Sequence, residues 1–440
     1  YGSSGTQILG GIISGNGALT HNGSGLLTLS GNNTFSGGTT ITAGTVRIGS
    51  NSSLGTGAVV FNNPSIATID SASGTTYTIS NNITLTNGLS VAVAYATGDL
   101  IFNGVISGAG SLYVNQTSGT ITLNGLNTFT GDIYPSRAPT ISFNSIANAG
   151  VASALGAGST IYGAVGGIAA FLNYTGNVSA STNRTFVLGG SSGGRLQANN
   201  AALTWTGNVT GNSLNLFLQG TAGGGANYNE LSGSFLNGAA LVIQAGSGNY
   251  VWRISGNNTH TGLTQVTNTS TMIAANANAF GTTANGTQVD TSGQLLLTGG
   301  IAVGAEALTL NSNASGTWNG YTGAALRSIS GNNSWAGNIT LGQATTIATD
   351  SGSNFTISGG ISGANNLTVN STGNTTISGI IGTSTGTLTK NGAGTLLLTA
   401  NNTYTGATTV NAGTLEISST GLLGGGSYSG NIANTGTLLL

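Results

Sequence analysis

LTKNGAGTLLLTANNTYTGATTVNAGTLEI, the stretch from Leu388 to Ile417, reads as three short strands separated by turns that contain glycine and asparagine. The strands are expected at Thr395–Thr399, Thr408–Asn411 and Thr414–Ile417. Apolar and polar residues alternate within them, which is the period-two pattern of a strand with one buried face. The turns contain Gly394, Gly406 and Gly413, where we expect a positive φ or a close approach of two backbones.

The same stretch occurs near the N-terminus. Leu19–Ile48 reads LTHNGSGLLTLSGNNTFSGGTTITAGTVRI and aligns with Leu388–Ile417 without a gap. Shorter copies contain NTFTG at Asn127–Gly131, NNTHTG at Asn257–Gly262 and NNSWAG at Asn332–Gly337. Recurring units of strands and turns are typical of a solenoid, in which stacked units bury an apolar column that no single unit buries alone. The residues expected in this column are Leu27, Leu29, Val46, Ile48, Leu396, Leu398, Leu415 and Ile417.

The repeats therefore predict an all-β fold, a parallel β-helix of about 20 coils with roughly 20–25 residues per coil. We expect a single continuous solenoid over residues 1–440, with a less regular central part at 134–255. Pro135 and Pro139 lie in that part and predict an excursion from the coil or an altered coil, because proline is poorly tolerated inside a sheet ladder. The outward positions are mostly Thr, Ser and Asn, and stacked asparagines are expected to form ladders between coils.

Two arginines receive different interpretations. Arg47 and Glu416 occupy one equivalent outward position, which indicates a solvated site. Arg327 instead aligns with the inward Leu27 and Leu396, where a bare charge would be costly. We therefore expect this copy to be bulged, or the coil to be open at Arg327.

Composition excludes several classes of protein. Only seven Lys and Arg residues are present in 440, and the net charge is −1. They cannot form the basic surface that binds nucleic acid, so no nucleic-acid partner is expected. No apolar run approaches the roughly 18–20 residues of a membrane helix, so we expect no membrane insertion of this chain. The first residue is Tyr1, with no leader-like segment, so either a signal peptide was removed or the sequence is a fragment.

Leu388–Ile417 and its copy Leu19–Ile48 resemble the autotransporter-associated β-strand repeat of bacterial secreted proteins. RTFVLGG at Arg184–Gly190 and NGVISGAGSL at Asn103–Leu112 are similar to other pieces of such proteins. The resemblance implies a right-handed parallel β-helix, export, and a secreted or cell-surface location. It implies no particular activity, because a solenoid is a scaffold.

We expect no catalytic residue, no cofactor and no metal site. The eight acidic residues form no local pair, and Asp132 with the nearby Arg137 is interpreted as a surface ion pair. Acidic residues on stacked coils can still meet, so a carbohydrate-active enzyme stays open as the lesser alternative. His21 aligns with Lys390, which predicts a polar turn, and His260 aligns with aromatic residues, which predicts a stacking position.

Aromatic side chains recur at one position of the repeat, as Phe35, Phe129, Trp335 and Tyr404. The favoured interpretation is that each covers a corner of the coil and stacks on its neighbour. A row of aromatic residues that binds carbohydrate is the alternative.

The leading functional prediction is a non-catalytic structural subunit of an extracellular bacterial fibre. Both ends of the sequence carry apolar strands without charges, and unpaired strand edges recruit further strands, so the chain is expected to stack head to tail on copies of itself. The expected interface residues are Thr6, Ile8, Ile12, Tyr428, Ile432, Thr437, Leu438, Leu439 and Leu440. The alternative is an autotransporter-type passenger that acts as a surface adhesin or stalk, with its barrel outside this sequence. Surface glycans are the second candidate partner.

Overall fold

The computed structural model describes residues 1–62, 67–71, 74–86, 89–93, 98–115, 119–136, 139–163, 170–244, 248–313 and 318–440. Neighbouring strands pair in parallel, as Leu27 with Val46 and Leu396 with Leu415 show. Among the described residues, the single helical segment is the 3₁₀ turn Gly424–Gly426. The fold is the expected all-β parallel solenoid, with about 18 coils. The chain forms two compact units, Tyr1–Leu216 and Phe217–Leu440, so the single continuous body stays a prediction.

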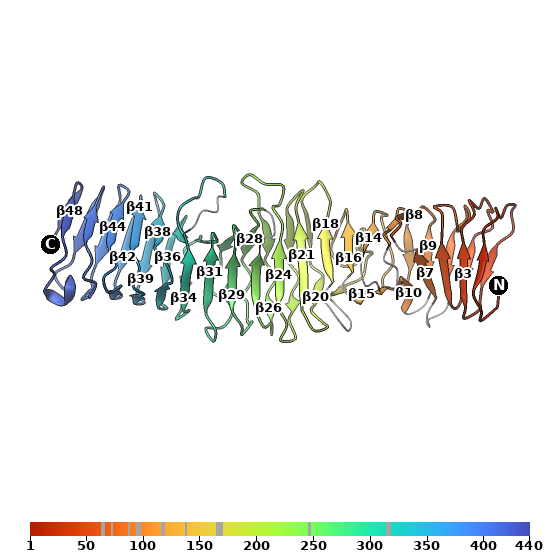
Figure 1. Ribbon diagram of the computed structural model, residues 1–440, viewed down its shortest axis with the longest axis horizontal. Coiled ribbons are helices and arrows are strands. Elements are labelled where there is room, and N and C mark those ends of the chain that lie inside the picture. The colour runs from red at the N-terminus through yellow and green to blue at the C-terminus, as the bar shows by residue number, and fades with distance from the viewer. Residues whose placement is uncertain are drawn as a thin grey trace. The chain divides into compact units, whose positions relative to one another are not determined.

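The first unit contains three main sheets, and each coil contributes short strands to them (Figure 1). One sheet contains β1 (Gln7–Leu9), β3 (Leu26–Leu29), β5 (Thr45–Ile48), β7 (Thr68–Ser71), β10 (Leu89–Val93), β13 (Ser111–Asn115), β15 (Ile133–Ser136), β17 (Thr160–Tyr162), β20 (Thr185–Val187) and β23 (Val209–Thr210). The second contains β2 (Leu19–His21), β4 (Thr39–Ile41), β6 (Val59–Phe61), β9 (Ile83–Leu85) and β12 (Ile106–Gly108). The third contains β8 (Tyr77–Ile79), β11 (Leu100–Phe102), β14 (Thr120–Leu123), β16 (Thr140–Phe143), β18 (Phe171–Tyr174) and β21 (Gly194–Ala198). A further pair is formed by β19 (Ala180–Thr182) and β22 (Leu203–Trp205).

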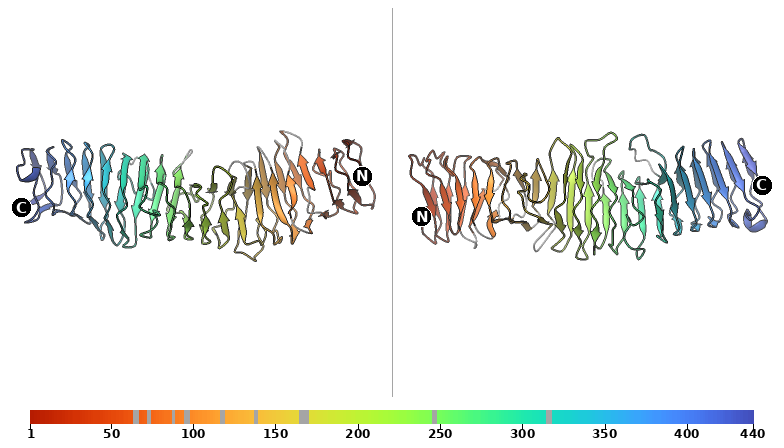
Figure 2. Two further views of the ribbon diagram at one scale, coloured as in Figure 1. Left: turned by 90° about the horizontal axis from the view of Figure 1, so that it is seen from below. Right: turned by 180° about the vertical axis from the view of Figure 1, so that it is seen from behind.

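The second unit repeats this arrangement, and Figure 2 shows its strands side by side in two further views. One sheet contains β27 (Leu241–Gln244), β29 (Thr264–Thr267), β31 (Thr287–Thr291), β34 (Leu308–Ser312), β37 (Ile339–Leu341), β40 (Ile361–Ser362) and β43 (Ile381–Gly382). The second contains β25 (Asn229–Leu231), β28 (Val251–Ile254), β30 (Thr271–Ala274), β32 (Gln294–Leu297), β35 (Leu326–Ser328), β38 (Thr345–Thr349), β41 (Leu367–Ser371), β44 (Leu388–Asn391), β46 (Thr408–Val410) and β48 (Ile432–Asn434). The third contains β33 (Ala302–Val303), β36 (Asn332–Trp335), β39 (Asn354–Ile357), β42 (Asn374–Ile377), β45 (Thr395–Leu398), β47 (Thr414–Ile417) and β49 (Thr437–Leu439). The remaining strands are β24 (Leu216–Gln219) and β26 (Phe235–Leu236).

The interior of each unit is an apolar column. In β3, β5, β45 and β47 buried and half-buried residues alternate strictly. All eight side chains expected in the column are at most 7% exposed. Stacking is the source of this burial, because each strand contributes only two inward side chains and relies on the coils on either side to cover them.

Glycine is required where successive coils turn. Gly44 and Gly413 are equivalent in the two full copies, and both have a φ of 68°. A Cβ atom would lie 2.3 Å from the carbonyl oxygen of Gly23 in the first case and 2.4 Å from that of Gly392 in the second. The turn therefore excludes side chains for two reasons, the positive φ and the backbone one coil away.

The central part departs from the expectation at Pro135. This residue lies within β15, buried and in register with Val114, so the chain makes no excursion at Pro135 itself, and the altered coil is the alternative that fits the structure. The coils here are instead lengthened between strands. Ser142 and Asn173 are register partners 31 residues apart. The register partners Leu27 and Val46 of the first copy are separated by fewer residues, so the coil is shorter there. The additional residues are accommodated in the turns, and the ladder continues.

The prediction that Arg327 occupies an inward position is also wrong. In β35 the side chains of Leu326 and Ser328 are buried and Arg327 between them is half-buried on the outer face. The copy is shifted because Asn332–Trp335, which aligned with a turn segment, forms a strand of its own, β36. Arg327 donates from Nε to Oδ1 of Asp350 over 2.7 Å, so the charge is paired outside the core.

Candidate binding surfaces

Polar side chains inside the coils have a structural role. Five buried asparagines lie two residues before the aromatic position of the repeat, and the Oδ1 of each accepts a hydrogen bond from a backbone N–H of the preceding coil. The donors and acceptors are Ile13 and Asn33, Ile106 and Asn127, Phe235 and Asn258, Ile301 and Asn333, and Ile381 and Asn402, over 2.7–2.9 Å. These asparagines are at most 3% exposed, so they hold coils together and offer nothing to a ligand. Outside the core, the expected asparagine ladders are present, for example from Asn374 to Asn354 and from Asn354 to Asn332.

The aromatic position of the repeat is also internal. Phe35, Phe129, Trp335 and Tyr404 are at most 2% exposed, so a carbohydrate-binding row at this position is wrong. His260 occupies the same position, and its ring is stacked on that of Phe235 at 5.2 Å between centroids, which confirms the predicted stacking position. Burial lowers the pKa of His260 to about 4.

The prediction of a polar turn for His21 and Lys390 is wrong. Both side chains are fully buried, in β2 and β44. The Nε2 atom of His21 lies 3.2 Å from the carbonyl oxygen of Gly25. The Nζ atom of Lys390 donates to the carbonyl oxygens of Asn391, Gly392 and Ala412 over 2.8, 2.7 and 3.2 Å. Burial lowers the pKa of both groups, to about 8 for Lys390. The turn carbonyls point inward here, and a buried donor satisfies them.

Charged groups on the outer faces are arranged as ion pairs between coils. Arg47 and Asp70 are register partners, with Nε 2.9 Å from Oδ2. Arg253 pairs with Glu230 in the same way. Asp132 accepts a hydrogen bond from the backbone N–H of Thr160 over 3.1 Å, while Arg137, its expected partner, lies outside the described residues. The described part of the chain contains no group of three or more His, Cys, Asp and Glu residues placed to hold a metal ion.

A row of tyrosines lies on the outer face of the first unit. Tyr113, Tyr134 and Tyr162 are half-buried on β13, β15 and β17. The ring centroids of Tyr113 and Tyr134 are 6.3 Å apart, and those of Tyr134 and Tyr162 are 4.6 Å apart and nearly parallel. Burial, followed by the neighbouring Tyr162 and Asp132, raises the pKa of Tyr134 to about 12, so its hydroxyl stays protonated at neutral pH. The row presents ring edges and hydroxyl groups at the spacing of the coils.

Sequence reasoning missed the tyrosine row because coil length hides it. Tyr113 and Tyr134 are register partners 21 residues apart, but a longer coil separates Tyr134 from Tyr162. The sequence did indicate that these tyrosines point outward, because each directly follows a Leu or Ile at an inward position of its strand.

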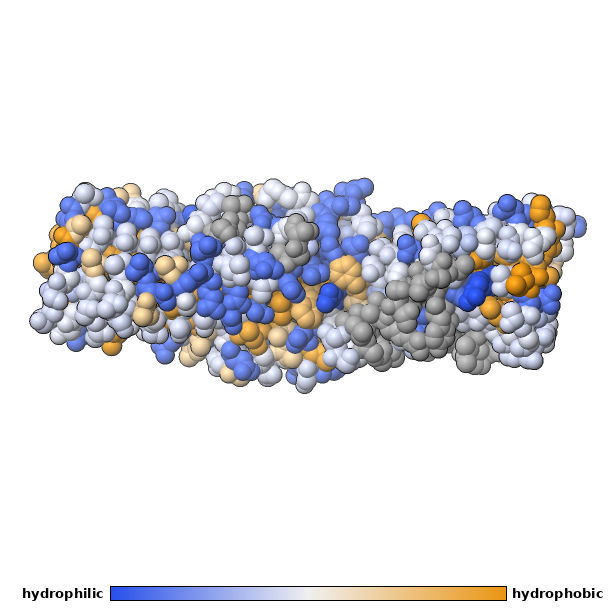
Figure 3. Space-filling view, in the orientation of Figure 1, coloured by the Kyte–Doolittle hydropathy of each residue, from blue (hydrophilic) through white to orange (hydrophobic). Residues whose placement is uncertain are grey.

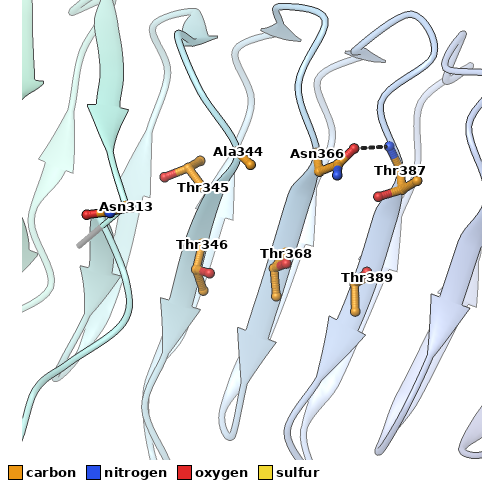
Figure 4. Close-up of a pocket in the computed structure, with 8 residues that line it drawn as sticks. All are labelled: Asn313, Ala344, Thr345, Thr346, Asn366, Thr368, Thr387 and Thr389. Carbon is orange, nitrogen blue, oxygen red and sulfur yellow. Dashed lines mark hydrogen bonds between the residues drawn. The ribbon is translucent and has the colours of Figure 1, made fainter. Parts of the chain in front are cut away.

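A row of threonines lies on the outer face of the second unit. Thr346, Thr368 and Thr389 are register partners on β38, β41 and β44, and Thr409 on β46 extends the row. Figure 4 shows three of these side chains on neighbouring strands, beside Asn366, whose Oδ1 accepts a hydrogen bond from the backbone N–H of Thr387 over 3.0 Å. Thr346, Thr368 and Thr389 line a shallow pocket of about 260 Å³. The other lining residues are Asn313, Ala344, Thr345, Asn366 and Thr387. This surface offers hydroxyl and amide groups and no charge.

The residues expected in a head-to-tail interface lie on the terminal coils. Ile8, Ile12, Ile432, Leu439 and Leu440 are 66%, 69%, 42%, 48% and 91% exposed. Thr6 and Thr437 are exposed, while Tyr428 and Leu438 are half-buried. The hydroxyl of Tyr428 lies 2.7 Å from Thr408 Oγ1 and donates to the carbonyl oxygen of Gly406 over 2.5 Å. Apolar residues at the N-terminal end are visible as orange atoms in Figure 3. No contact in the structure tests this interface.

Comparison with known proteins places the repeats in context. Residues 19–48, 242–268 and 388–417 match the passenger-associated-transport-repeat. Over 315 residues, 68% of its length, the chain is 30% identical to the adhesin BmaC autotransporter of Brucella suis biovar 1 (strain 1330). The chain spans only 9% of the length of that relative. No solved structure matches the chain. Among the described residues, no helix has the length and apolarity needed to cross a membrane.

Proposed function

Because the chain belongs to the family of autotransporter passenger proteins that carry this repeat, we propose that it is a non-catalytic, surface-displayed segment of an adhesin or of its stalk. Membership of the family implies exposure at the cell surface or outside the cell. The name of the Brucella relative describes that protein as an adhesin, which supports the proposal for this chain.

One observation carries the proposal. The outer faces of both units present continuous rows of neutral side chains at coil spacing, the tyrosine row on one unit and the threonine row on the other. A surface of this kind repeats the same weak contact many times, and repeated contacts reach high avidity without a deep site. Among the described residues, three ion pairs between coils neutralise six of the charged side chains on the outer faces.

Adherence of coated beads tests the proposal. Beads coated with the folded chain are incubated with layers of animal cells and with surfaces that carry immobilised neutral glycans. Coated beads should adhere above the level of uncoated beads, and beads coated with the heat-unfolded chain should not. Absence of adherence to every surface would contradict an adhesin and would leave only the stalk role.

The two rows are distinguished by matched variants. Replacing Tyr113, Tyr134 and Tyr162 by serine removes one row, and replacing Thr346, Thr368 and Thr389 by alanine removes the other. All six side chains are half-buried on outer faces, so both variants should keep the circular dichroism of the parent. A row contributes to adherence if beads coated with the variant that lacks this row adhere less than beads coated with the parent.

Stacking of copies into a fibre is a second candidate function. The surface that such a contact would use includes the apolar side chains of Ile8, Ile12 and Leu439, which are exposed on the first and last coils of this sequence. A contact of this kind would consist mainly of backbone hydrogen bonds and apolar side chains, so high salt should not dissolve it. Sedimentation velocity at rising concentration tests it, with a variant that lacks Thr437–Leu440 as the control. An intact chain that stays monomeric, or a truncated chain that forms the same fibres, would contradict the fibre.

A further inference from the structure

Part of one outer face of the second unit is an apolar cluster that is covered by other residues. Val251, Ile273 and Leu296 point outward from β28, β30 and β32, opposite to inward residues such as Trp252, and they are at most 2% exposed. Residues from two segments between strands pack against them, Tyr228 from one and Trp318 and Tyr321 from the other.

Trp318 is held rigidly within this cluster. Its Nε1 donates to the carbonyl oxygen of Asn227 over 3.0 Å, although the two residues are 91 positions apart. One side of its ring stacks on Tyr321 at 5.7 Å between centroids, and Tyr228 meets it edge-on at 6.2 Å. The guanidinium carbon of Arg327 lies 4.9 Å from the centre of the Tyr321 ring, and this cation–π contact holds Tyr321 in place.

A pocket of about 260 Å³ opens beside the indole ring. Its wall consists of Trp318, Val251, Thr221, Asn249, Asn319, Gly224 and Gly225. Gly224 and Gly225 have φ values of 75° and 65°, and a Cβ atom on either would meet nothing within 4 Å. These glycines therefore serve the turn itself and leave open space beside the indole.

We propose that this pocket binds one ring of a neutral glycan. A sugar ring has an apolar face of C–H groups, which packs on an aromatic ring, and an edge of hydroxyl groups, which pairs with amides and hydroxyls. The pocket wall offers that combination, with the part of the Trp318 ring that lines the pocket for the face and Asn249, Asn319 and Thr221 for the edge. No charged residue lines it, so an anionic sugar or a charged peptide would lose hydration without a compensating ion pair. A drug-sized ligand occupies roughly 300–1,000 Å³, so this pocket suits a single ring.

The inference rests on the proposed adhesin function and names a ligand class and a site for it. Tryptophan fluorescence tests it directly, because the chain has four tryptophans and Trp205, Trp252 and Trp335 are fully buried, whereas Trp318 is 8% exposed. The full chain is titrated with lactose and with N,N′-diacetylchitobiose, and with heparin oligosaccharide as the charged comparator. We expect a saturable change in emission with a neutral sugar and none with heparin.

Three variants assign the signal to the pocket. Thr221→Leu places a larger apolar side chain in the pocket wall, removes one of its hydroxyl groups, and should weaken the apparent affinity at least tenfold. Thr309→Leu makes the same change at a half-buried outer position of β34, away from the pocket and from both rows, and should leave the affinity unchanged. Trp318→Phe should abolish the fluorescence change.

The outcomes separate this inference from the proposed function. No saturable response to either neutral sugar, or binding that Thr221→Leu leaves intact, overturns the pocket assignment even if coated beads adhere to cells. A response confined to heparin, or adherence abolished only by a competing peptide, overturns the neutral-glycan assignment. Sugar binding that depends on Thr221 while beads fail to adhere supports the pocket and counts against the adhesin.

Discussion

The side-chain oxygen of Asn402 accepts a hydrogen bond of 2.9 Å from the backbone N–H of Ile381, which lies on the preceding coil. The Nδ2 group of the same side chain donates to the carbonyl oxygen of Leu422, on the following coil, over 3.2 Å. Asn33 joins Ile13 to Ser53 in the same manner in the first unit. One buried amide thus ties three successive coils together through their interior, where no water competes for the backbone groups.

Asn402→Ala should lower the free energy of unfolding by about 1–3 kcal/mol, because the N–H of Ile381 is then buried without a partner. Urea unfolding followed by circular dichroism measures the change. Asn401→Ala is the matched control, since Asn401 is the exposed neighbour in the same turn, and it should have almost no effect. Equal effects of the two substitutions would contradict the bridging role.

Leu398→Asp should destabilise the protein by several kcal/mol, because the carboxylate would be buried without a partner. Leu398 is 0% exposed in β45. Thr376→Asp places the same charge on the outer face of the adjoining strand β42, where Thr376 is half-buried, and should cost much less. Thermal melts of the two variants compare them, and a Leu398→Asp variant that melts with the parent would contradict the core assignment.

Glu306 should make stability depend on pH. Burial raises the pKa of its carboxyl to about 7, while the hydroxyl of Thr287, 2.8 Å from Oε1, opposes that shift. The folded chain therefore keeps a proton that the unfolded chain, with its ordinary pKa of 4.5, has already released. The contribution of this group to stability is fully present below about pH 4.5, falls as the pH rises towards 7 and is constant above it.

Glu306→Gln isolates this effect, because glutamine keeps an acceptor for Thr287 and does not titrate. As the pH rises from 4.5 to 7, the free energy of unfolding of the parent should fall relative to that of this variant. Buried His260 contributes equally to both proteins and cancels in the difference. A difference that is independent of pH would contradict the buried position of Glu306.

The sequence predicts the repeated core well because the inward positions of complete copies are constrained twice, by period two within the strand and by register with the next coil. Leu27 and Leu396 could be placed without a structure for this reason. Arg327 could not, because its copy lacks the gapless match, and a shift of one residue exchanges the inner and outer faces of a strand. The pocket beside Trp318 was equally beyond prediction, since Asn227 and Trp318 meet across 91 residues.

Lys390 provides the last prediction, because the two full copies differ at this buried position. His21 stands there in the first copy and directs Nε2 to the carbonyl oxygen of Gly25, whereas Lys390 directs Nζ to three carbonyl oxygens. Lys390→His should therefore be tolerated better than Lys390→Met, although methionine is closer in length and carries no desolvation cost. The methionine leaves the inward carbonyl groups of Asn391 and Gly392 without a donor, at a cost of about 1–3 kcal/mol. Urea unfolding midpoints rank the two variants, and a Lys390→Met protein at least as stable as Lys390→His would show that apolar burial outweighs the inward carbonyl groups at this corner of the coil.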